Sequence, residues 1–290
     1  MQPGTPFVHS AFMADPADLV TRAIAILSED NIMTCEAQSV GLPRQLRAPN
    51  DLIQSSGLPL QRRVLSDGTE VPLPVRYFDA QCLLATFVTE LSAATALLEG
   101  TGLQAVLQED GKAIALLGCF EYRTTDIGAY NEACLAILAV ASGDPIPAFY
   151  VTNLPVTTAT ANRAGREIWG FNKFVTAIEV ERDRNNFSTT VRDPGNATIL
   201  MLEGGRSASV EMPPTDVLTF SLLAGKVLKT IVRVMTPFKV SSGENFVLNV
   251  GGSAHAMANN LRTLALDGAR PVLLQYADPF QSLLFPGRVV

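Results

Sequence analysis

The sequence predicts a mainly β protein of the α+β class, in which an antiparallel, barrel-like sheet carries a few peripheral helices. From residue 75 onward, many short apolar segments are separated by tight turn signals, and few segments show a helical period. The regular alternation of strand and helix that a doubly wound parallel sheet requires is missing. With 290 residues, of which 47% are hydrophobic and 17% charged, the chain can bury a large core.

The first 70 residues differ in pattern from the rest. We predict an N-terminal helix and arm over residues 1–70 and a single β domain over residues 71–290. Asp15 is placed to cap an amphipathic helix that has Pro16 in its first turn. The segment 41–73 is rich in Pro, Gly, Ser and Arg and has no sustained period, which favours an ordered arm or partner-contacting loop over a disordered linker.

The elements of the β domain follow from local patterns. The predicted helices are 90–98 and 254–266, and the predicted strands are 76–88, 103–107, 112–122, 133–140, 173–182, 187–192, 198–202, 207–212, 218–223, 271–277 and 283–290. The turn signal Glu109-Asp110-Gly111 predicts that the strands on either side of it form a hairpin. The strands on either side of the polar segment 183–186 are expected to pair in the same way.

Composition restricts the classes of partner. The net charge of −6 and a pI near 5.0 argue against nucleic acid or an anionic membrane as a partner. The four cysteines show no CxxC spacing and the chain has two histidines, so we predict no metal site, and the absence of a glycine-rich phosphate loop leaves no cofactor predicted. Free thiols and an N-terminus without a signal-peptide pattern lead us to expect a cytoplasmic protein. The longest apolar run, 133–141, is too short to cross a bilayer.

One lysine lies inside an otherwise apolar run. If the run around Lys173 is extended, alternation puts Phe171, Lys173 and Val175 on one face, with apolar neighbours only. Desolvation disfavours the ammonium form, so a lysine buried there is expected to carry a neutral, nucleophilic amine that can form a Schiff base with a carbonyl substrate. The alternative is that Lys173 packs its stem and extends its amine to water.

The motifs around this lysine resemble those of the acetoacetate decarboxylase family. The residues Gly165-Arg166-Glu167 and Gly170-Phe171-Asn172-Lys173 resemble the family's glycine-arginine-glutamate and aromatic-proline-lysine-lysine signature. Upstream, Phe120-Glu121 and Gly128-Ala129-Tyr130-Asn131-Glu132 resemble its phenylalanine-glutamate pair and its glycine-x-tyrosine-x-glutamate turn. The ending Pro286-Gly287-Arg288-Val289-Val290 resembles the family's last strand more weakly. Together the matches extend over roughly residues 70 to 290.

The resemblance implies a cone-shaped β domain, a homo-oligomer and a small keto acid or related carbonyl substrate. Six residues are therefore candidates for the site: Lys173, Glu121 and Glu132 as catalytic groups, and Arg76, Phe171 and Trp169 as substrate-binding groups. Without the resemblance, the two glutamates are interpreted as solvated loop acids and Arg76 as a surface arginine. Trp169, the only tryptophan, is then interpreted as a core residue.

Two departures from the family pattern bear on the reaction. The family's second lysine is Phe174 here, and the proline before the first lysine is Asn172. Because family lysines of this type are activated partly by an adjacent cation, activation of Lys173 must come from burial, or from a cation such as Arg76 or Arg123. We therefore expect a decarboxylase-like lyase with a Schiff-base lysine. The alternatives are an aldolase-dehydratase of the same superfamily and a non-catalytic binding protein that kept the pocket.

Overall fold

The structure is a computed structural model that describes residues 61–108, 110–183, 186–205 and 207–290. The helix predicted from Asp15 and the first part of the predicted arm lie outside these residues, so the division into two parts at residue 70 stays a prediction. Within the arm, residues 61–73 form a hairpin of β1 (Gln61–Val64) and β2 (Glu70–Leu73). Its turn lies against the helix that contains Glu167, α4 (Ala159–Trp169), because Glu167 accepts hydrogen bonds from the backbone N–H and the hydroxyl of Ser66.

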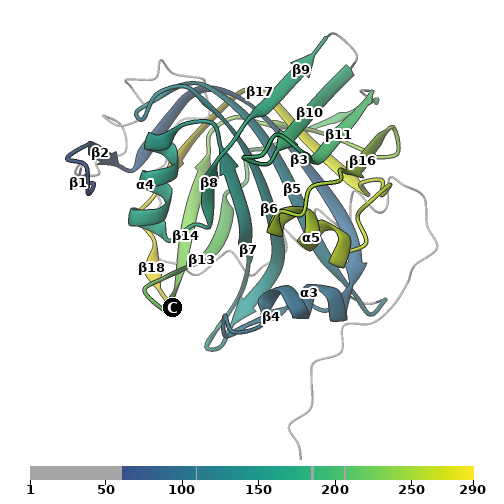
Figure 1. The fold of residues 1–290 in the computed structure, drawn as a ribbon, viewed down its shortest axis with the longest axis horizontal. Coiled ribbons are helices and arrows are strands. Elements are labelled where there is room, and N and C mark those ends of the chain that lie inside the picture. Colours follow the sequence, from purple (N-terminus) through teal and green to yellow (C-terminus); the bar gives the residue numbers. More distant parts are fainter. Residues whose placement is uncertain (1–60, 109, 184–185, 206) are drawn as a thin grey trace, which may run out of the picture.

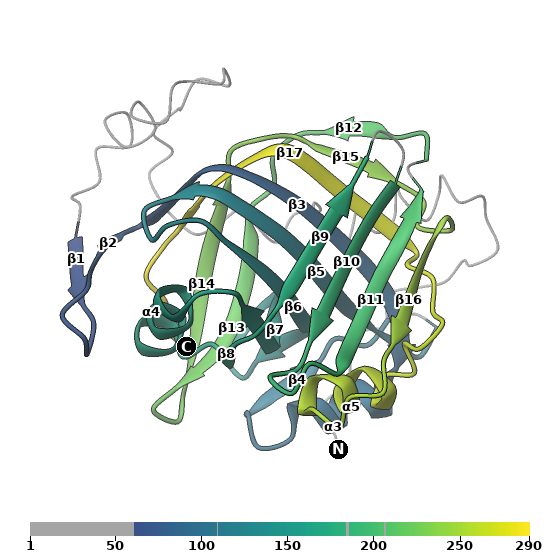
Figure 2. The same cartoon turned by 45° about the horizontal axis from the view of Figure 1, so that its top comes forward.

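A strongly curved sheet dominates the described residues, as Figures 1 and 2 show. It has twelve strands. Its strands are β3 (Val75–Glu90), β4 (Leu103–Ala105), β5 (Lys112–Thr125), β6 (Tyr130–Ala141), β7 (Asp144–Val156), β8 (Lys173–Val175), β12 (Val210–Met212), β13 (Val217–Leu223), β14 (Lys226–Val234), β15 (Phe238–Ser241), β17 (Leu273–Leu284) and β18 (Arg288–Val289). The main path runs β12-β15-β17-β3-β5-β6-β7-β13-β14-β18. An additional pairing between β14 and β17 brings distant strands of this path together and makes the sheet barrel-like. The predicted fold class is confirmed.

A second sheet and three helices cover parts of the large sheet (Figure 2). The second sheet has the order β16 (Phe246–Val250), β11 (Thr198–Gly205), β10 (Asn186–Arg192), β9 (Ile178–Arg182). The helices of the described residues are α3 (Leu91–Leu98), α4 (Ala159–Trp169) and α5 (Ala256–Thr263). The two helices predicted within the β domain are confirmed as α3, one residue shorter than predicted, and α5, five residues shorter. Among the residues described, no helix is long and apolar enough to cross a membrane.

Strand alternation gives the protein two apolar cores. On β5, Leu117 and Cys119 face a core shared with the second sheet, α3 and α5. Leu116 and Tyr122 of the same strand face the opposite core, which lies inside the curve of the large sheet and includes α4. Successive residues of a strand point to opposite faces, so one strand contributes side chains to both cores. Its sequence is therefore a nearly continuous apolar run. This pattern explains why the sequence predicted β3, β5 and β6 well.

The predicted hairpin at Glu109-Asp110-Gly111 is wrong. The strand before the turn, β4, pairs with β6, where Leu103 lies opposite Ala141. The strand after it, β5, pairs with β3 on one side and β6 on the other. With both of its edges occupied, β5 has no place for β4, so the turn signal marks the chain reversal but not the pairing.

The predicted strand 173–182 is two strands in different sheets. β8 joins the large sheet beside β7, and β9 begins the second sheet, where it pairs with β10 as predicted across the polar segment. The residues just before β8 form the helix α4, which was not predicted. Thr158 caps its N-terminus, and Gly170 ends it in a left-handed conformation with φ of 68°. A β-carbon at Gly170 would overlap the backbone of Leu222, so this position requires glycine.

Candidate active site

A cavity of about 100 Å³ lies inside the curve of the large sheet. Inward-facing residues of β3, β5, β6, β7, β13, β14 and β17 form most of its wall, which is mainly aromatic and aliphatic. A single water needs roughly 10–15 Å³ of such space, so the cavity has room for a small organic molecule. Two charged residues line it, Lys173 and Glu132.

Lys173 enters the cavity because of the turn that follows α4. After Gly170, the chain runs parallel to β7, and Lys173 pairs with Leu154. Asn172, at the position of the family's proline, fixes this turn through hydrogen bonds with β7: its side chain donates to the Thr152 carbonyl over 2.8 Å, and its carbonyl accepts from Leu154 N over 3.0 Å. The lysine side chain is 6% exposed, so it does not extend to water.

The amine of Lys173 has a charged partner that the strand pattern did not indicate. Its Nζ donates a hydrogen bond to Glu132 Oε2 over 2.5 Å, and both side chains are buried. The expectation of an exclusively apolar environment is therefore wrong, because β6 and β8 pair with opposite edges of β7 and place the two side chains on the same face of the sheet. On its other side, the lysine stem lies against Gly165 of α4, where a β-carbon would overlap Cδ and Cε of Lys173.

Three tyrosines surround the ion pair, and sequence reasoning missed them as site residues. The Tyr122 hydroxyl lies 3.4 Å from Glu132 Oε1, the Tyr130 ring centroid lies 5.6 Å from Lys173 Nζ, and the hydroxyls of Tyr77 and Tyr130 are 3.3 Å apart. Burial first, and then the charge of Glu132, raise the pKa of Tyr77 and Tyr122. Both phenols therefore stay protonated near neutral pH and serve as hydrogen-bond donors. Only Tyr130, two residues before Glu132 on β6, carried a local signal, because alternate residues of a strand share a face.

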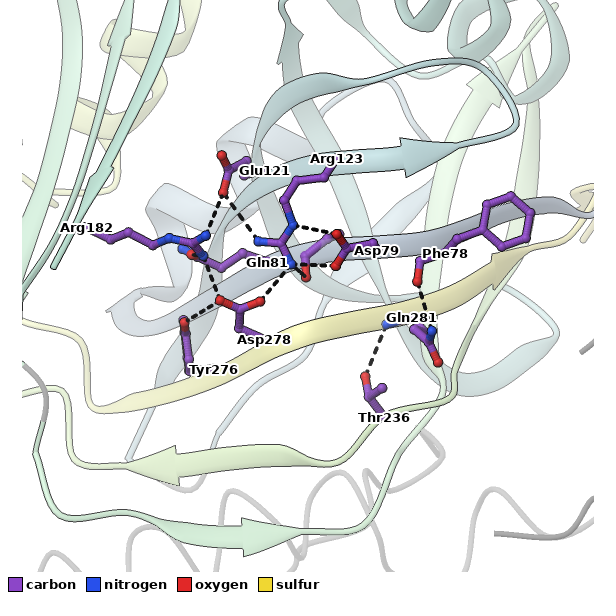
Figure 3. Close-up of polar contacts among 11 residues, drawn as sticks. Phe78, Asp79, Gln81, Glu121, Arg123, Arg182, Thr236, Tyr276, Asp278 and Gln281 are labelled. Atoms are coloured by element: carbon purple, nitrogen blue, oxygen red, sulfur yellow. Dashed lines mark hydrogen bonds and ion pairs between the residues drawn. The ribbon is translucent and has the colours of Figure 1, made fainter. Parts of the chain in front are cut away.

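The structure does not bring Glu121 to Lys173. Phe120 lies opposite Glu132 in the β5–β6 pair, so Glu121, the next residue, points to the other face of the sheet. There its carboxylate lies 3.6 Å from Arg123 and 3.6 Å from Arg182, within the charged cluster shown in Figure 3. Asp278 accepts hydrogen bonds from both arginines in this cluster.

The three predicted substrate-binding residues occupy different places. Phe171 lines the cavity next to Lys173. Trp169 lies behind it, with ring centroids 6.3 Å apart, and its indole N–H donates to the Phe285 carbonyl over 2.7 Å. Arg76 does not line the cavity; it forms an ion pair with Asp126 at 2.7 Å.

Phe174, where the family has its second lysine, faces away from the cavity. Its ring packs on His255 with centroids 4.3 Å apart and contacts the core beneath the second sheet. Phe174 therefore supports the packing of the sheet and is not placed to touch a molecule in the cavity. Arg123, considered as a substitute cation, lies with Glu121 in the cluster on the far face and donates to Asp79.

The described cysteines are free, and burial raises the pKa of each thiol, that of Cys119 to about 12. Two of them, Cys82 and Cys134, line the cavity as neutral thiols. Within the residues that the structure describes, no group of three or more His, Cys, Asp or Glu side chains is arranged to hold a metal ion.

Fold and site together define a β protein with an internal apolar cavity that holds a lysine–glutamate pair. The family model for acetoacetate decarboxylase (ADC) matches residues 59–231, more than half of the chain. The chain belongs to the acetoacetate decarboxylase family. A comparison with curated proteins finds no match.

Solved structures with a similar fold include three proteins of low sequence identity to this chain. Acetoacetate decarboxylase from Legionella pneumophila is 15% identical, with a TM-score of 0.58 over 86% of this chain and 98% of that one. An acetoacetate decarboxylase-like enzyme from Sphingomonas wittichii RW1 is 14% identical, with a TM-score of 0.55 over 74% and 91%. The enduracididine biosynthesis enzyme MppR complexed with pyruvate is 13% identical, with a TM-score of 0.55 over 74% and 90%.

Proposed function

We propose that this protein is a Schiff-base-forming enzyme that acts on a small carbonyl compound, with Lys173 as the nucleophile. The observation that carries the proposal is the buried lysine amine 2.5 Å from the Glu132 carboxylate in an otherwise apolar cavity. Buried ion pairs of this kind often add little to stability, so the pair requires another explanation. Membership of the acetoacetate decarboxylase family supports a lyase reaction.

Glu132 supplies the proton transfers that the amine requires. It accepts a proton from the Lys173 ammonium, which leaves a neutral amine to attack the substrate carbonyl. It then returns the proton to the carbinolamine hydroxyl, which leaves as water and gives a cationic iminium beside the glutamate carboxylate. Tyr122 holds the glutamate from its other oxygen, and Phe171 forms the cavity wall beside the amine.

The iminium withdraws electrons from the adjacent carbon, so it stabilises the carbanion formed either by loss of CO₂ or by removal of a proton. Decarboxylation of a keto acid is one candidate reaction. Aldol addition with dehydration is the second, and MppR in complex with the condensation product of pyruvate and imidazole 4-carboxaldehyde supports it by analogy. Glu121 and Arg76 are not included in the proposal, because their charged partners lie outside the cavity.

Reductive trapping tests the proposal. Incubation with pyruvate or acetoacetate and cyanoborohydride should add one substrate-derived group, which peptide mapping places on Lys173. Lys173→Arg should abolish the adduct. Lys229 provides the internal control, because it is also buried and paired, with Asp144 at 3.0 Å, but does not line the cavity; it should stay unmodified. An adduct that survives in Lys173→Arg would refute the assignment.

Trapping also separates the enzyme from a binding protein that kept the pocket. A catalyst should consume the trapped substrate when the reductant is omitted, with release of CO₂ or formation of an aldol product. A chain that forms the adduct on Lys173 but turns over none of a panel of carbonyl compounds is a binding protein.

A further inference from the structure

The charges of the cavity wall restrict the kind of substrate that the site can hold. Of the described residues that line the cavity, only Lys173 carries a positive charge, and Glu132 already neutralises it. The remaining polar groups of the wall are uncharged hydroxyls and thiols: Tyr77, Tyr122, Ser282, Thr219, Cys82 and Cys134. Tyr122 and Tyr77 are engaged, the first by Glu132 and the second by Tyr130.

Arg76 and Arg123, the two arginines considered as alternative cations, are held elsewhere by carboxylates, and Arg166, which donates to the Lys173 backbone carbonyl over 2.9 Å, does not line the cavity. Arg76 binds Asp126 through three side-chain hydrogen bonds of 2.7–3.0 Å. Arg123 lies on the opposite face of the sheet, where it binds Asp79 and Asp278. Neither lines the cavity, so neither is placed to bind a substrate carboxylate there.

The charge balance of the intermediate differs between neutral and acidic substrates. With a neutral ketone or aldehyde, the iminium cation on Lys173 replaces the ammonium cation, and its pairing with Glu132 keeps the cavity neutral. With a keto acid, the substrate carboxylate adds a second negative charge, which leaves the cavity with a net charge of −1. An unpaired charge in an apolar environment is strongly unfavourable, and two neighbouring carboxylates repel each other.

Thr219 places a neutral polar group in the cavity wall at a distance from Lys173. Lys173 pairs with Leu154 of β7, whereas Thr219 pairs with Phe149 of the same strand, five residues away. At about 3.3 Å per residue, these two positions are about 16 Å apart along the strand. Thr219 Oγ1 is buried and has no hydrogen-bond partner within the described residues, so it can bind a neutral oxygen of an occupant but cannot neutralise a carboxylate.

From this geometry we infer that the natural substrate of the Lys173 site is an uncharged carbonyl compound, a ketone or aldehyde with an apolar body, and not a keto acid. This inference rests on the proposed Schiff-base function.

A substrate without a carboxylate cannot lose CO₂. Its iminium instead loses a proton from the adjacent carbon to Glu132, which gives a neutral enamine and a protonated glutamate. The enamine carbon then adds to the carbonyl carbon of a second aldehyde, and that carbonyl oxygen takes up the proton.

The experiment compares probes that differ in charge and hardly in shape. Acetoacetate is paired with acetoacetamide, and pyruvate with pyruvamide, each incubated with the full-length wild-type protein and cyanoborohydride. Intact mass gives the labelled fraction at each concentration, and labelling of free N-acetyl-lysine corrects for the intrinsic reactivity of each carbonyl. We expect the neutral member of each pair to half-saturate labelling of Lys173 at a concentration at least tenfold lower than the acid.

The variant Glu132→Gln tests the physical cause. It removes the negative charge and retains the shape, so the cavity can then balance an iminium against a substrate carboxylate. The slower proton transfer affects both members of a pair alike, and we expect the preference for the neutral member to fall at least tenfold. A preference that persists unchanged in Glu132→Gln would overturn the electrostatic explanation.

The outcomes separate the inference about substrate charge from the Schiff-base function on which it rests. Equal or better labelling of Lys173 by the acids overturns the inference and leaves the Schiff-base function intact. Failure of every probe to label Lys173 overturns the proposed function, and the inference with it. Labelling of Lys173 by the amides, together with the predicted change in Glu132→Gln, supports both.

Discussion

At the residue scale, the direction of the Lys173 side chain depends on Gly165. This glycine lies on the α4 face that the lysine stem crosses, and the stem occupies the space of a β-carbon. The variant Gly165→Ala should improve helix propensity by about 1 kcal/mol, yet it must displace the stem from its place beside Glu132. We expect the labelling of Lys173 to fall at least tenfold while circular dichroism shows a native fold.

Gly252→Ala is the control for that substitution. No atom lies within 4 Å of a β-carbon at this position, so labelling should match the wild type. Normal labelling of Gly165→Ala would show that the lysine stem can move without loss of function, and that the contact with α4 is not required.

Two members of the site could be predicted from the sequence, and their arrangement could not. The motif around Lys173 identified the lysine, and the glycine-x-tyrosine-x-glutamate turn identified Glu132. Their contact depends on the register of β6, β7 and β8, in which Glu132 pairs with Val156 and Lys173 with Leu154. A shift by one residue would turn either side chain to the other face. Glu121 illustrates this sensitivity, because its neighbour on β5, Phe120, lines the cavity while Glu121 points to the other face of the sheet.

At the element scale, the charged cluster of Figure 3 ties four strands together. Asp79 of β3, Glu121 and Arg123 of β5, Arg182 of β9 and Asp278 of β17 join the large sheet to the second sheet. Hydrogen bonds from Arg123 lower the pKa of Asp79. A carboxyl group whose pKa is lowered on folding stabilises the fold above its unfolded pKa of about 3.9 and loses that contribution as the pH falls.

We therefore predict that Asp79→Asn flattens the decline in stability below about pH 4. At pH 7 the variant should lose less than about 1 kcal/mol, because this side chain is 44% exposed and solvent screens the pair. Urea denaturation at a series of pH values measures both effects. Asp110→Asn is the control, since that residue lies outside the cluster. Parallel pH profiles of wild type and Asp79→Asn would refute the prediction.

The strands that the sequence predicted best are those whose pattern is independent of tertiary context. β3 and β6 are long apolar runs. The helix α4 was missed because its sequence, Ala159–Trp169, combines small, polar and charged residues and contains Gly165, which weakens a helix signal. Its start is fixed by a Thr158 cap and its end by the left-handed Gly170, and neither feature is specific in sequence alone.

At the scale of the whole molecule, sheet curvature produces the cavity. Lys173 lies on β8, beyond α4, whereas Glu132 lies 41 residues earlier on β6. They meet because β7 lies between their strands and pairs with both, and because the β14–β17 pairing curves the sheet around the space they share. The closure depends on contacts between residues about 50 positions apart, such as Val232 and Leu284, which no local pattern encodes.

The edges of the sheets lead to the last prediction, that the protein is a homo-oligomer. β12 ends the path of the large sheet, and within the described residues only β15 pairs with it. Val210 on this strand is 63% exposed, and an exposed apolar edge strand is a favourable surface for pairing with a second chain. Light scattering at micromolar concentration should return a multiple of the 31.0 kDa chain mass.

The variant Val210→Lys adds charge to the edge strand, so it should lower the measured mass if β12 forms the contact. Val272→Lys is the control, because it changes an exposed valine outside the strands and should leave the mass unchanged. A wild-type mass equal to one chain would contradict the prediction.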